Sequence, residues 1–264
     1  MTVQQSVAIV TGASSGIGYK VAETLVKQGY KVYGISRRGT APAGAVPLRA
    51  DVSVKAEIDK AIAFAIAEAG KIDMLIANAG MGISGPIEFA EQAAMDKIMS
   101  VDFYGQVYCA RAVLKQMREQ NFGKIVFVSS VAAAIAIPYQ AFYSAAKAAV
   151  CSVALALRNE VKSFNIKVSC VQPGDCATGF TDAREKDEAH DDVYTQNRKA
   201  TASMEKDERS GMSPESAAKE IVKIAQKKHP KPIYIIGFKY KLFALLFRLL
   251  PGRLSYAIVG KMYG

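Results

Sequence analysis

The chain has 264 residues, half of them hydrophobic and 22% charged, and a formal net charge of +10 at pH 7. This composition excludes an intrinsically disordered protein and is typical of one large or two small folded domains. The four cysteines form no Cys-x-x-Cys pair and lie far in sequence from both histidines, so we expect no metal site and no disulfide framework.

Apolar segments rich in β-branched residues alternate with helical patterns along most of the chain. The expected strands, in chain order, cover residues 6–11, 31–36, 46–50, 72–78, 123–130, 166–173 and 232–237. The expected helices lie between them, at 16–29, at 54–69, within 92–120, around 141–150 and from Ser213 onward. Strands that alternate with helices form parallel sheets covered on both faces, so we predict one α/β domain over residues 1–237.

Residues 178–212 fit this alternation poorly, because they are mostly polar and charged. Two interpretations stay open for such a long insertion in a compact domain. The segment is either a solvated surface helix or mobile loop, or a lid over a substrate site, inserted between a strand and the next helix.

The stretch TGASSGIG, residues 11–18, lies where the first expected strand becomes the first expected helix. Gly12 permits a tight turn, Gly16 lets the backbone approach a ligand closely, and Gly18 lets the helix pack against the sheet. The amides at the helix N-terminus then face an anion. A purely structural turn is the alternative, but the flanking strand and helix favour a dinucleotide site. Its predicted members are Gly12, Ser14, Ser15, Gly16, Ile17 and Gly18.

The second expected strand ends in Ser36, Arg37 and Arg38. An acidic residue at this point would accept hydrogen bonds from the ribose 2′-hydroxyl of NAD. Arginine instead offers a planar, permanently charged group to the 2′-phosphate of NADP. The three residues therefore predict NADP in preference to NAD, with two simply solvated arginines as the alternative.

Four further motifs follow the glycine turn in a fixed order: ANAG at 77–80, VSS at 128–130, YSAAK at 143–147 and VQPG at 171–174. With them the chain resembles the short-chain dehydrogenase/reductase family, classical type, over about residues 6–237. The resemblance implies a Rossmann-like, doubly wound parallel sheet of about seven strands with helices on both faces. It also implies NAD(P) as hydride carrier and a homodimer or homotetramer.

The resemblance implies catalytic roles for Ser130, Tyr143 and Lys147, the last two also binding the cofactor. Tyr143 and Lys147 are four residues apart, so they share one face of a helix. The Lys147 ammonium would stabilise the phenolate and lower the pKa of Tyr143, while Ser130 would hydrogen-bond the substrate oxygen. The other cofactor-side positions implied by the resemblance are Asp51, Val52, Asn78, Ala79, Gly80, Pro173, Gly174 and Thr178.

Asp102 departs from the family pattern, which usually has asparagine at this position of the central helix. An aspartate accepts hydrogen bonds but cannot donate one unless protonated, and its charge would raise the pKa of Lys147. Two interpretations follow: the charge reduces activity or shifts its pH dependence, or Asp102 substitutes adequately for asparagine.

The C-terminal segment 238–264 is basic and apolar. Between Ile221 and Gly264 the chain has nine basic residues and no acidic one, so this part carries +9 of the total +10. Its uncharged runs, such as Leu242–Phe247, are far too short to span a bilayer. Leucines on one helical face, with lysine and arginine at the rim, favour an interfacial helix on an anionic membrane. Packing on the core, closure of the substrate pocket and contact with another subunit are the alternatives.

These features predict an NADP(H)-dependent oxidoreductase that interconverts a small hydrophobic ketone or aldehyde and its alcohol, such as a steroid, retinoid or other lipid. The pocket would be lined in part by residues 81–87, 131–139 and 178–212. A membrane-surface scaffold or regulatory nucleotide-binding protein with little turnover is the alternative. No nucleic acid is expected as partner, because no recognition motif accompanies the basic residues. No signal peptide is evident, which favours a cytoplasmic location, with possible peripheral membrane contact.

Overall fold

The structure is a computed structural model that describes residues 5–263. Residues 1–4 and Gly264 lie outside the described residues. Residues 1–4 belong to the predicted domain and to the N-terminus in which no signal peptide was expected, and Gly264 belongs to the C-terminal segment.

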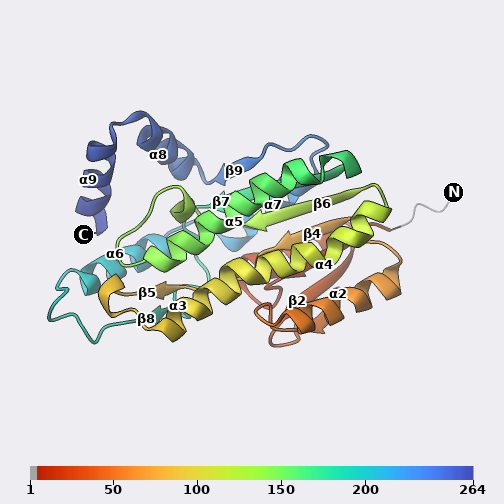
Figure 1. Ribbon diagram of the computed structural model, residues 1–264, viewed down its shortest axis with the longest axis horizontal. Helices are drawn as coiled ribbons and strands as arrows, with labels where there is room; N and C mark the ends of the chain where they lie inside the picture. The colour runs from red at the N-terminus through yellow and green to blue at the C-terminus, as the bar shows by residue number, and fades with distance from the viewer. Residues whose placement is uncertain (1–4, 264) are drawn as a thin grey trace.

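A seven-stranded parallel sheet forms the centre of the molecule (Figure 1), in the order β3-β2-β1-β4-β6-β7-β9. Its strands are β1 (Val7–Thr11), β2 (Lys31–Ser36), β3 (Val46–Arg49), β4 (Met74–Ala77), β6 (Gly123–Val128), β7 (Ile166–Pro173) and β9 (Ile233–Ile236). The chain starts at β1, moves outward to β3 and then returns to β4 on the other side. This reversal opens a crevice at the carboxyl ends of β1 and β4, where such sheets bind their ligands. The predicted doubly wound α/β fold is confirmed.

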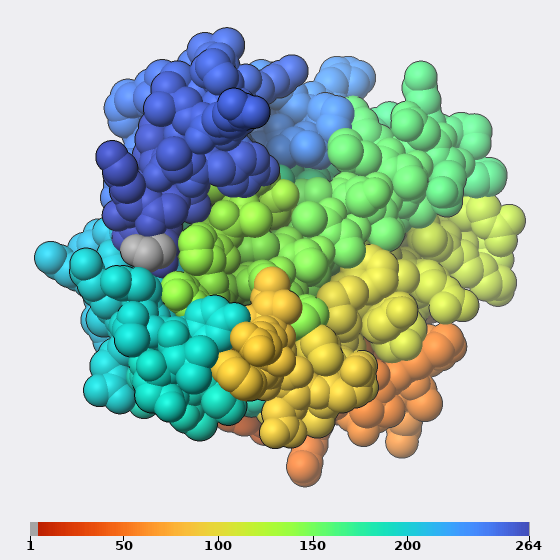
Figure 2. All heavy atoms as spheres, turned by 60° about the vertical axis from the view of Figure 1, so that its left-hand side comes forward, coloured from red at the N-terminus to blue at the C-terminus, as the bar shows by residue number. Residues whose placement is uncertain are grey.

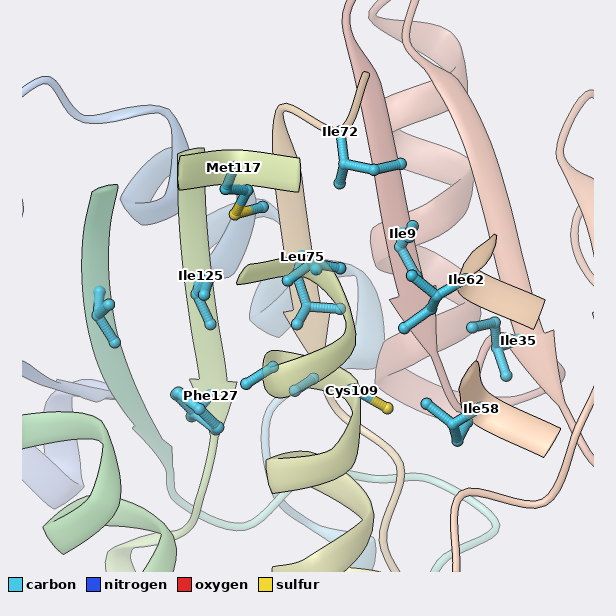
Figure 3. Packing of buried hydrophobic residues seen from close by; sticks show 14 of the residues in the cluster. Ile9, Ile35, Ile58, Ile62, Ile72, Leu75, Cys109, Met117, Ile125 and Phe127 are labelled. Atoms are coloured by element: carbon cyan, nitrogen blue, oxygen red, sulfur yellow. The ribbon is translucent and has the colours of Figure 1, made fainter. Parts of the chain in front are cut away.

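Helices cover both faces of the sheet, because the strands are apolar on both sides. One face is covered by α1 (Gly16–Lys27) and α7 (Pro214–Gln226), and the other by α2 (Lys55–Ala69), α4 (Gly105–Glu119) and α5 (Ala141–Glu160). Figure 3 shows this second face, with Ile58 and Ile62 of α2 and Met117 of α4 packed over the isoleucine and leucine side chains of the strands. The resulting core holds the ends of β1, β4 and β6 in fixed register.

The long helix expected within 92–120 has a change of geometry in its middle. It begins as α3 (Gln92–Ile98), continues as a π-helical stretch over Met99–Tyr104, and becomes α4 at Gly105. Asp102 lies in the π-helical stretch and is fully buried. Wide helical turns of this kind are rare and are frequently found at functional sites.

Residues 178–212 contain two ordered elements: a two-residue strand that the sequence did not predict, and a helix, which one of the two open interpretations included. Strand β8 (Glu185–Lys186) pairs in parallel with β5 (Ile83–Ser84), and α6 follows at Asn197–Arg209. The pairing brings this segment next to the loop that follows β4, at the carboxyl edge of the main sheet.

The C-terminal segment forms two helices, α8 (Phe238–Leu249) and α9 (Gly252–Tyr263). They are separated at Pro251, whose missing N–H and fixed ring geometry prevent α8 from continuing. Both helices lie at one end of the molecule, and the C-terminal end of α9 comes down beside α6 (Figures 1 and 2).

Candidate active site

A cavity of about 850 Å³ runs along the carboxyl edge of the sheet, from the glycine turn to the two C-terminal helices. The predicted site residues all line this cavity except Gly18 and Asp102. The structure therefore brings residues from six of the seven central strand ends into one continuous space. Gly18 and Asp102 lie immediately behind the cavity wall, where Gly18 packs against Gly12 and Asp102 pairs with Lys147.

The glycine turn between β1 and α1 approaches the loop after β4 very closely. Gly12 has a φ of +70°, in the left-handed region, and a Cβ on it would lie 2.9 Å from Nδ2 of Asn78. The Thr11 hydroxyl accepts hydrogen bonds from the backbone amides of Asn78 and Ala79, at 2.9 and 3.0 Å. A Cβ on Gly18 would lie 2.4 Å from the carbonyl oxygen of Gly12, so Gly18 serves helix packing rather than the cavity wall.

The N-terminus of α1 opens toward the cavity. Ser15, the residue before the helix, makes no side-chain hydrogen bond to the first turn, and Gly16 has a φ of +56°. Exposed backbone amides and missing side chains make a cradle that suits the pyrophosphate of a dinucleotide. This part of the chain therefore fits a nicotinamide dinucleotide on geometric grounds.

The strand end of β2 gives this cavity a basic rim. Arg38 donates two hydrogen bonds, from Nε at 3.2 Å and Nη2 at 2.9 Å, to the hydroxyl of Ser14 in the glycine turn. Arg37 is exposed beside it, and Ser36 is buried, with its hydroxyl bonded to the carbonyl of Thr40. The Asp51 carboxylate, after β3, accepts hydrogen bonds from the amide and hydroxyl of Ser53. The guanidinium of Arg38 is thus held in place over the turn.

Helix α5 and strand β6 present the predicted reactive side chains to the middle of the cavity. Ser130 ends β6 and caps a short 3₁₀ helix over Val131–Ala133, with its hydroxyl accepting the Ala132 amide at 3.1 Å. The ammonium of Lys147 lies 5.5 Å from the ring centroid of Tyr143. On its other side the Tyr143 ring packs against Phe180, with centroids 5.8 Å apart.

Asp102 makes a buried ion pair with Lys147. Oδ2 of Asp102 lies 2.9 Å from Nζ of Lys147, and the two side chains are 0% and 5% exposed. The other carboxylate oxygen accepts the backbone amide of Met81 at 2.7 Å. A Cβ on Gly80 would lie 2.9 Å from the carboxylate and 3.1 Å from the ammonium, so the glycine makes room for the pair.

Burial and this ion pair set the protonation of the site. Burial lowers the pKa of Lys147, but the attraction of Asp102 and Tyr143 outweighs it, so that pKa is raised overall. Burial also raises the pKa of Asp102, against the opposing effect of Lys147. The pKa of Tyr143 is raised as well, because burial and the Asp102 charge outweigh Lys147 and a hydrogen bond from Ser130. Lys147 therefore lowers the pKa of Tyr143 as expected, while burial and the Asp102 charge make the net shift upward.

The sequence interpretation did not include the C-terminal helices among the site residues. Tyr240 and Phe243 of α8 and Val259 and Tyr263 of α9 line the far end of the cavity. Tyr240 donates a hydrogen bond to Asp175, and a Cβ on Gly174 would lie 2.0 Å from the Tyr240 ring. The sequence does contain a pattern that could have indicated this contact: Tyr240, Phe243 and Phe247 recur at intervals of three and four residues, on the side of α8 opposite the leucines.

Comparison with known proteins assigns the chain to a family. The sequence model described as short chain dehydrogenase matches residues 6–189. The 3-ketodihydrosphingosine reductase of Bacteroides thetaiotaomicron is 41% identical over 231 residues, covering 86% of each chain. The NADPH-dependent 1-acyldihydroxyacetone phosphate reductase of Saccharomyces cerevisiae is 33% identical, covering 87% of this chain and 82% of the yeast protein.

A solved structure agrees with these matches. A short-chain dehydrogenase from Streptomyces avermitilis superimposes with a TM-score of 0.84 at 27% identity, covering 99% of this chain and 98% of the other. The fold of this family holds a nicotinamide cofactor, and its members transfer hydride at CH–OH groups. This chain belongs to the short-chain dehydrogenase/reductase family and is an oxidoreductase that acts on CH–OH groups.

Proposed function

We propose that the protein is an NADPH-dependent reductase that converts a long-chain hydrophobic ketone into the secondary alcohol. The observation that carries this proposal is the continuity of one cavity, from Ser130 and Tyr143 to an apolar far end. The apolar side chains at that end are Val131, Ile135, Met204, Phe243 and Val259, while Phe180 lines the cavity beside Tyr143. Two relatives are named for reducing ketones that carry a long hydrocarbon chain, which supports the same substrate class here.

The proposed chemistry assigns one task to each reactive side chain. The nicotinamide, when bound, supplies the hydride to the carbonyl carbon. Ser130 donates a hydrogen bond to the carbonyl oxygen and so stabilises the negative charge that develops there. Tyr143 gives its phenolic proton to that oxygen, and Lys147, held by Asp102, compensates the charge left on the phenolate.

A protonated Tyr143 suits reduction, in which the phenol acts as a general acid. Burial raises the pKa of this phenol, in the direction that keeps the proton on it. Alcohol oxidation requires the phenolate instead, and therefore a higher pH.

We propose NADPH as the preferred cofactor because Arg38 is positioned over the glycine turn and no carboxylate ends β2. The proposed binding residues are those predicted from the sequence, with Gly18 supporting the turn from behind. We further propose residues 178–212 as a lid, since Thr178, Phe180 and Met204 line the cavity. A homodimer or homotetramer, and a cytoplasmic location with contact at a membrane surface, complete the proposal.

Replacing Arg38 with alanine is expected to raise the KM for NADPH by roughly 10- to 100-fold, because a charge-assisted contact to the 2′-phosphate is lost. The KM for NADH should change little, since NADH has no 2′-phosphate. Arg49→Ala serves as the control, because Arg49 is an exposed arginine on β3 that does not line the cavity. Equal effects of Arg38→Ala on both cofactors would contradict a 2′-phosphate contact.

The function itself is tested by following NADPH consumption with ketones of increasing chain length, 3-ketodihydrosphingosine included. We expect kcat/KM to rise at least about tenfold between a short and a long alkyl ketone, because each buried methylene contributes about 0.8 kcal/mol. NADH should support slower turnover than NADPH. A preference for short, polar ketones, or consumption only with NADH, would refute the proposed substrate and cofactor.

A further inference from the structure

Helix α8 presents a stripe of large apolar side chains to solvent, and α9 exposes further apolar side chains. On α8 the stripe repeats at intervals of three and four residues, which places it on one helical face. Its exposed fractions run from 46% at Leu246 to 84% at Phe238, and α9 adds Leu254 at 49% and Met262 at 41%. The α8 members are Phe238, Leu242, Leu245, Leu246 and Leu249.

The opposite face of α8 already satisfies the packing needs of the helix. Tyr240, Phe243 and Phe247 pack with Val259 of α9 against Val131 and Ile135 beside the cavity. The helices therefore do not need the outer leucines in order to stay attached. Surfaces of soluble proteins rarely gather so many apolar side chains without a partner.

Basic residues surround the apolar stripe. Residues 238–263 contain five basic residues and no acidic one, a net charge of +5. On α8, Lys239 lies on one flank of the stripe, and Lys241 and Arg248 lie on the other, by helical geometry. The Lys239 ammonium also lies 4.0 Å from the carboxylate of Asp207 on α6. Arg253 and Lys261 add charge on α9. An apolar face between two basic flanks matches a bilayer whose surface carries anionic headgroups.

A second copy of the chain fits this face less well than a bilayer does. In a two-fold dimer the same patch meets itself, so five basic residues would face five others. Lysine is also depleted at the centres of protein interfaces in general. The segment also does not cross the bilayer, since α8 has 12 residues and spans only about 18 Å.

Within the part of the chain that the structure describes, α5 is the one helix with the length and composition of a membrane span. It carries Tyr143 and Lys147 and packs in the core beside β7, so it is not available to a bilayer.

We propose that the outer face of α8–α9 docks on an anionic lipid bilayer, with both helices lying in the plane of its surface. The inner faces of the same helices line the cavity, through Tyr240, Phe243, Val259 and Tyr263. Docking therefore places the apolar end of the cavity next to the hydrocarbon of the membrane. A long-chain ketone would then enter the cavity directly from the bilayer. This route of entry rests on the proposed function, whereas the docking itself does not.

The test is co-sedimentation of the full chain with vesicles of phosphatidylcholine containing phosphatidylglycerol, compared with phosphatidylcholine alone. We expect partitioning into anionic vesicles to exceed that into neutral ones by at least about tenfold, and to fall with rising salt. The double variant Leu242→Glu/Leu249→Glu should lose at least about tenfold in partitioning, because each change replaces an apolar anchor with a repelled charge.

The matched control is Phe64→Glu/Phe122→Glu, which adds the same two charges at exposed apolar positions away from α8 and α9. It should bind vesicles like the unchanged protein. The proposal is overturned if the unchanged protein stays in the supernatant, or if the two double variants bind equally well. It is also overturned if Leu242→Glu/Leu249→Glu dissociates an oligomer in solution, because a second copy would then cover this face.

Turnover separates docking from the proposed function. A short, water-soluble ketone should be reduced equally by the unchanged protein and by Leu242→Glu/Leu249→Glu, because neither leucine lines the cavity. Reduction of a vesicle-held long-chain ketone should fall at least about fivefold in the variant, in step with its lost partitioning. Vesicle binding without turnover of any ketone would leave docking intact and refute the proposed function alone.

Discussion

Tyr143→Phe is expected to lower kcat/KM for NADPH-dependent ketone reduction by about 10²- to 10⁴-fold, the usual contribution of a positioned general acid. The phenyl ring keeps its packing against Phe180, so the cavity retains its shape. Only the proton donor is lost, and water would have to replace it within a largely buried site. The measurement is steady-state NADPH consumption with a long-chain ketone.

NADPH binding supplies the control for this variant. The dissociation constant, measured by the fluorescence of the bound nicotinamide, should stay within about threefold of the unchanged value, since Lys147 and the glycine turn remain in place. A loss of binding equal to the loss of turnover would mean that Tyr143 holds the cofactor rather than transfers the proton. Retention of more than about a tenth of the activity would remove Tyr143 from the proposed mechanism.

Asp102→Ala is expected to destabilise the protein by about 3 to 5 kcal/mol, because it leaves the buried Lys147 ammonium without its partner. The exposed pair between Lys55 and Asp59 provides the comparison. Asp59→Ala should cost less than about 1 kcal/mol, since solvent screens that pair. Urea unfolding followed by circular dichroism measures both values. A cost below about 1 kcal/mol for Asp102→Ala would show that Lys147 does not depend on this carboxylate for its charge.

Asp102→Asn keeps the side-chain shape and separates charge from packing. The Asp102 charge raises the pKa of both Tyr143 and Lys147, so its removal lowers both relative to the unchanged protein. Reduction needs protonated Tyr143, and kcat/KM therefore falls as pH rises through the pKa of that phenol. In the variant this fall should occur at lower pH. A pH profile identical to that of the unchanged protein would indicate that the charge has no catalytic consequence.

The order of the strands and helices could be predicted, because hydrophobic periodicity and capping residues mark each of them locally in the sequence. Strands β2 and β7 have the predicted bounds, and α7 begins after Ser213, whose hydroxyl caps the helix. The short strands β5 and β8 escaped prediction, because two-residue elements carry no detectable periodicity. Their pairing depends on residues about a hundred positions apart.

The environment of Tyr143 shows where local patterns stop being sufficient. The spacing of Tyr143 and Lys147 places them on one helical face, and the structure has them there. The lowering effect of Lys147 on the pKa of Tyr143 was predicted, whereas the upward contributions of burial and of the Asp102 charge depend on the tertiary structure. Gly80 is a similar case, because only the tertiary structure shows that the Asp102–Lys147 ion pair occupies the space that a side chain at this position would need.

The sequence alone determined the parallel α/β fold, the glycine turn and the candidate reactive residues, because each rests on neighbours within a few positions of the chain. Only the tertiary structure decided which face of α8 packs against the rest of the protein. Both faces of α8 are apolar, and hydrophobic periodicity alone cannot tell whether the aromatic face or the leucine face packs against the protein. The choice came from the concave wall formed by Val131, Ile135 and α9, which accepts Tyr240 and Phe243 and leaves the leucine stripe in solvent.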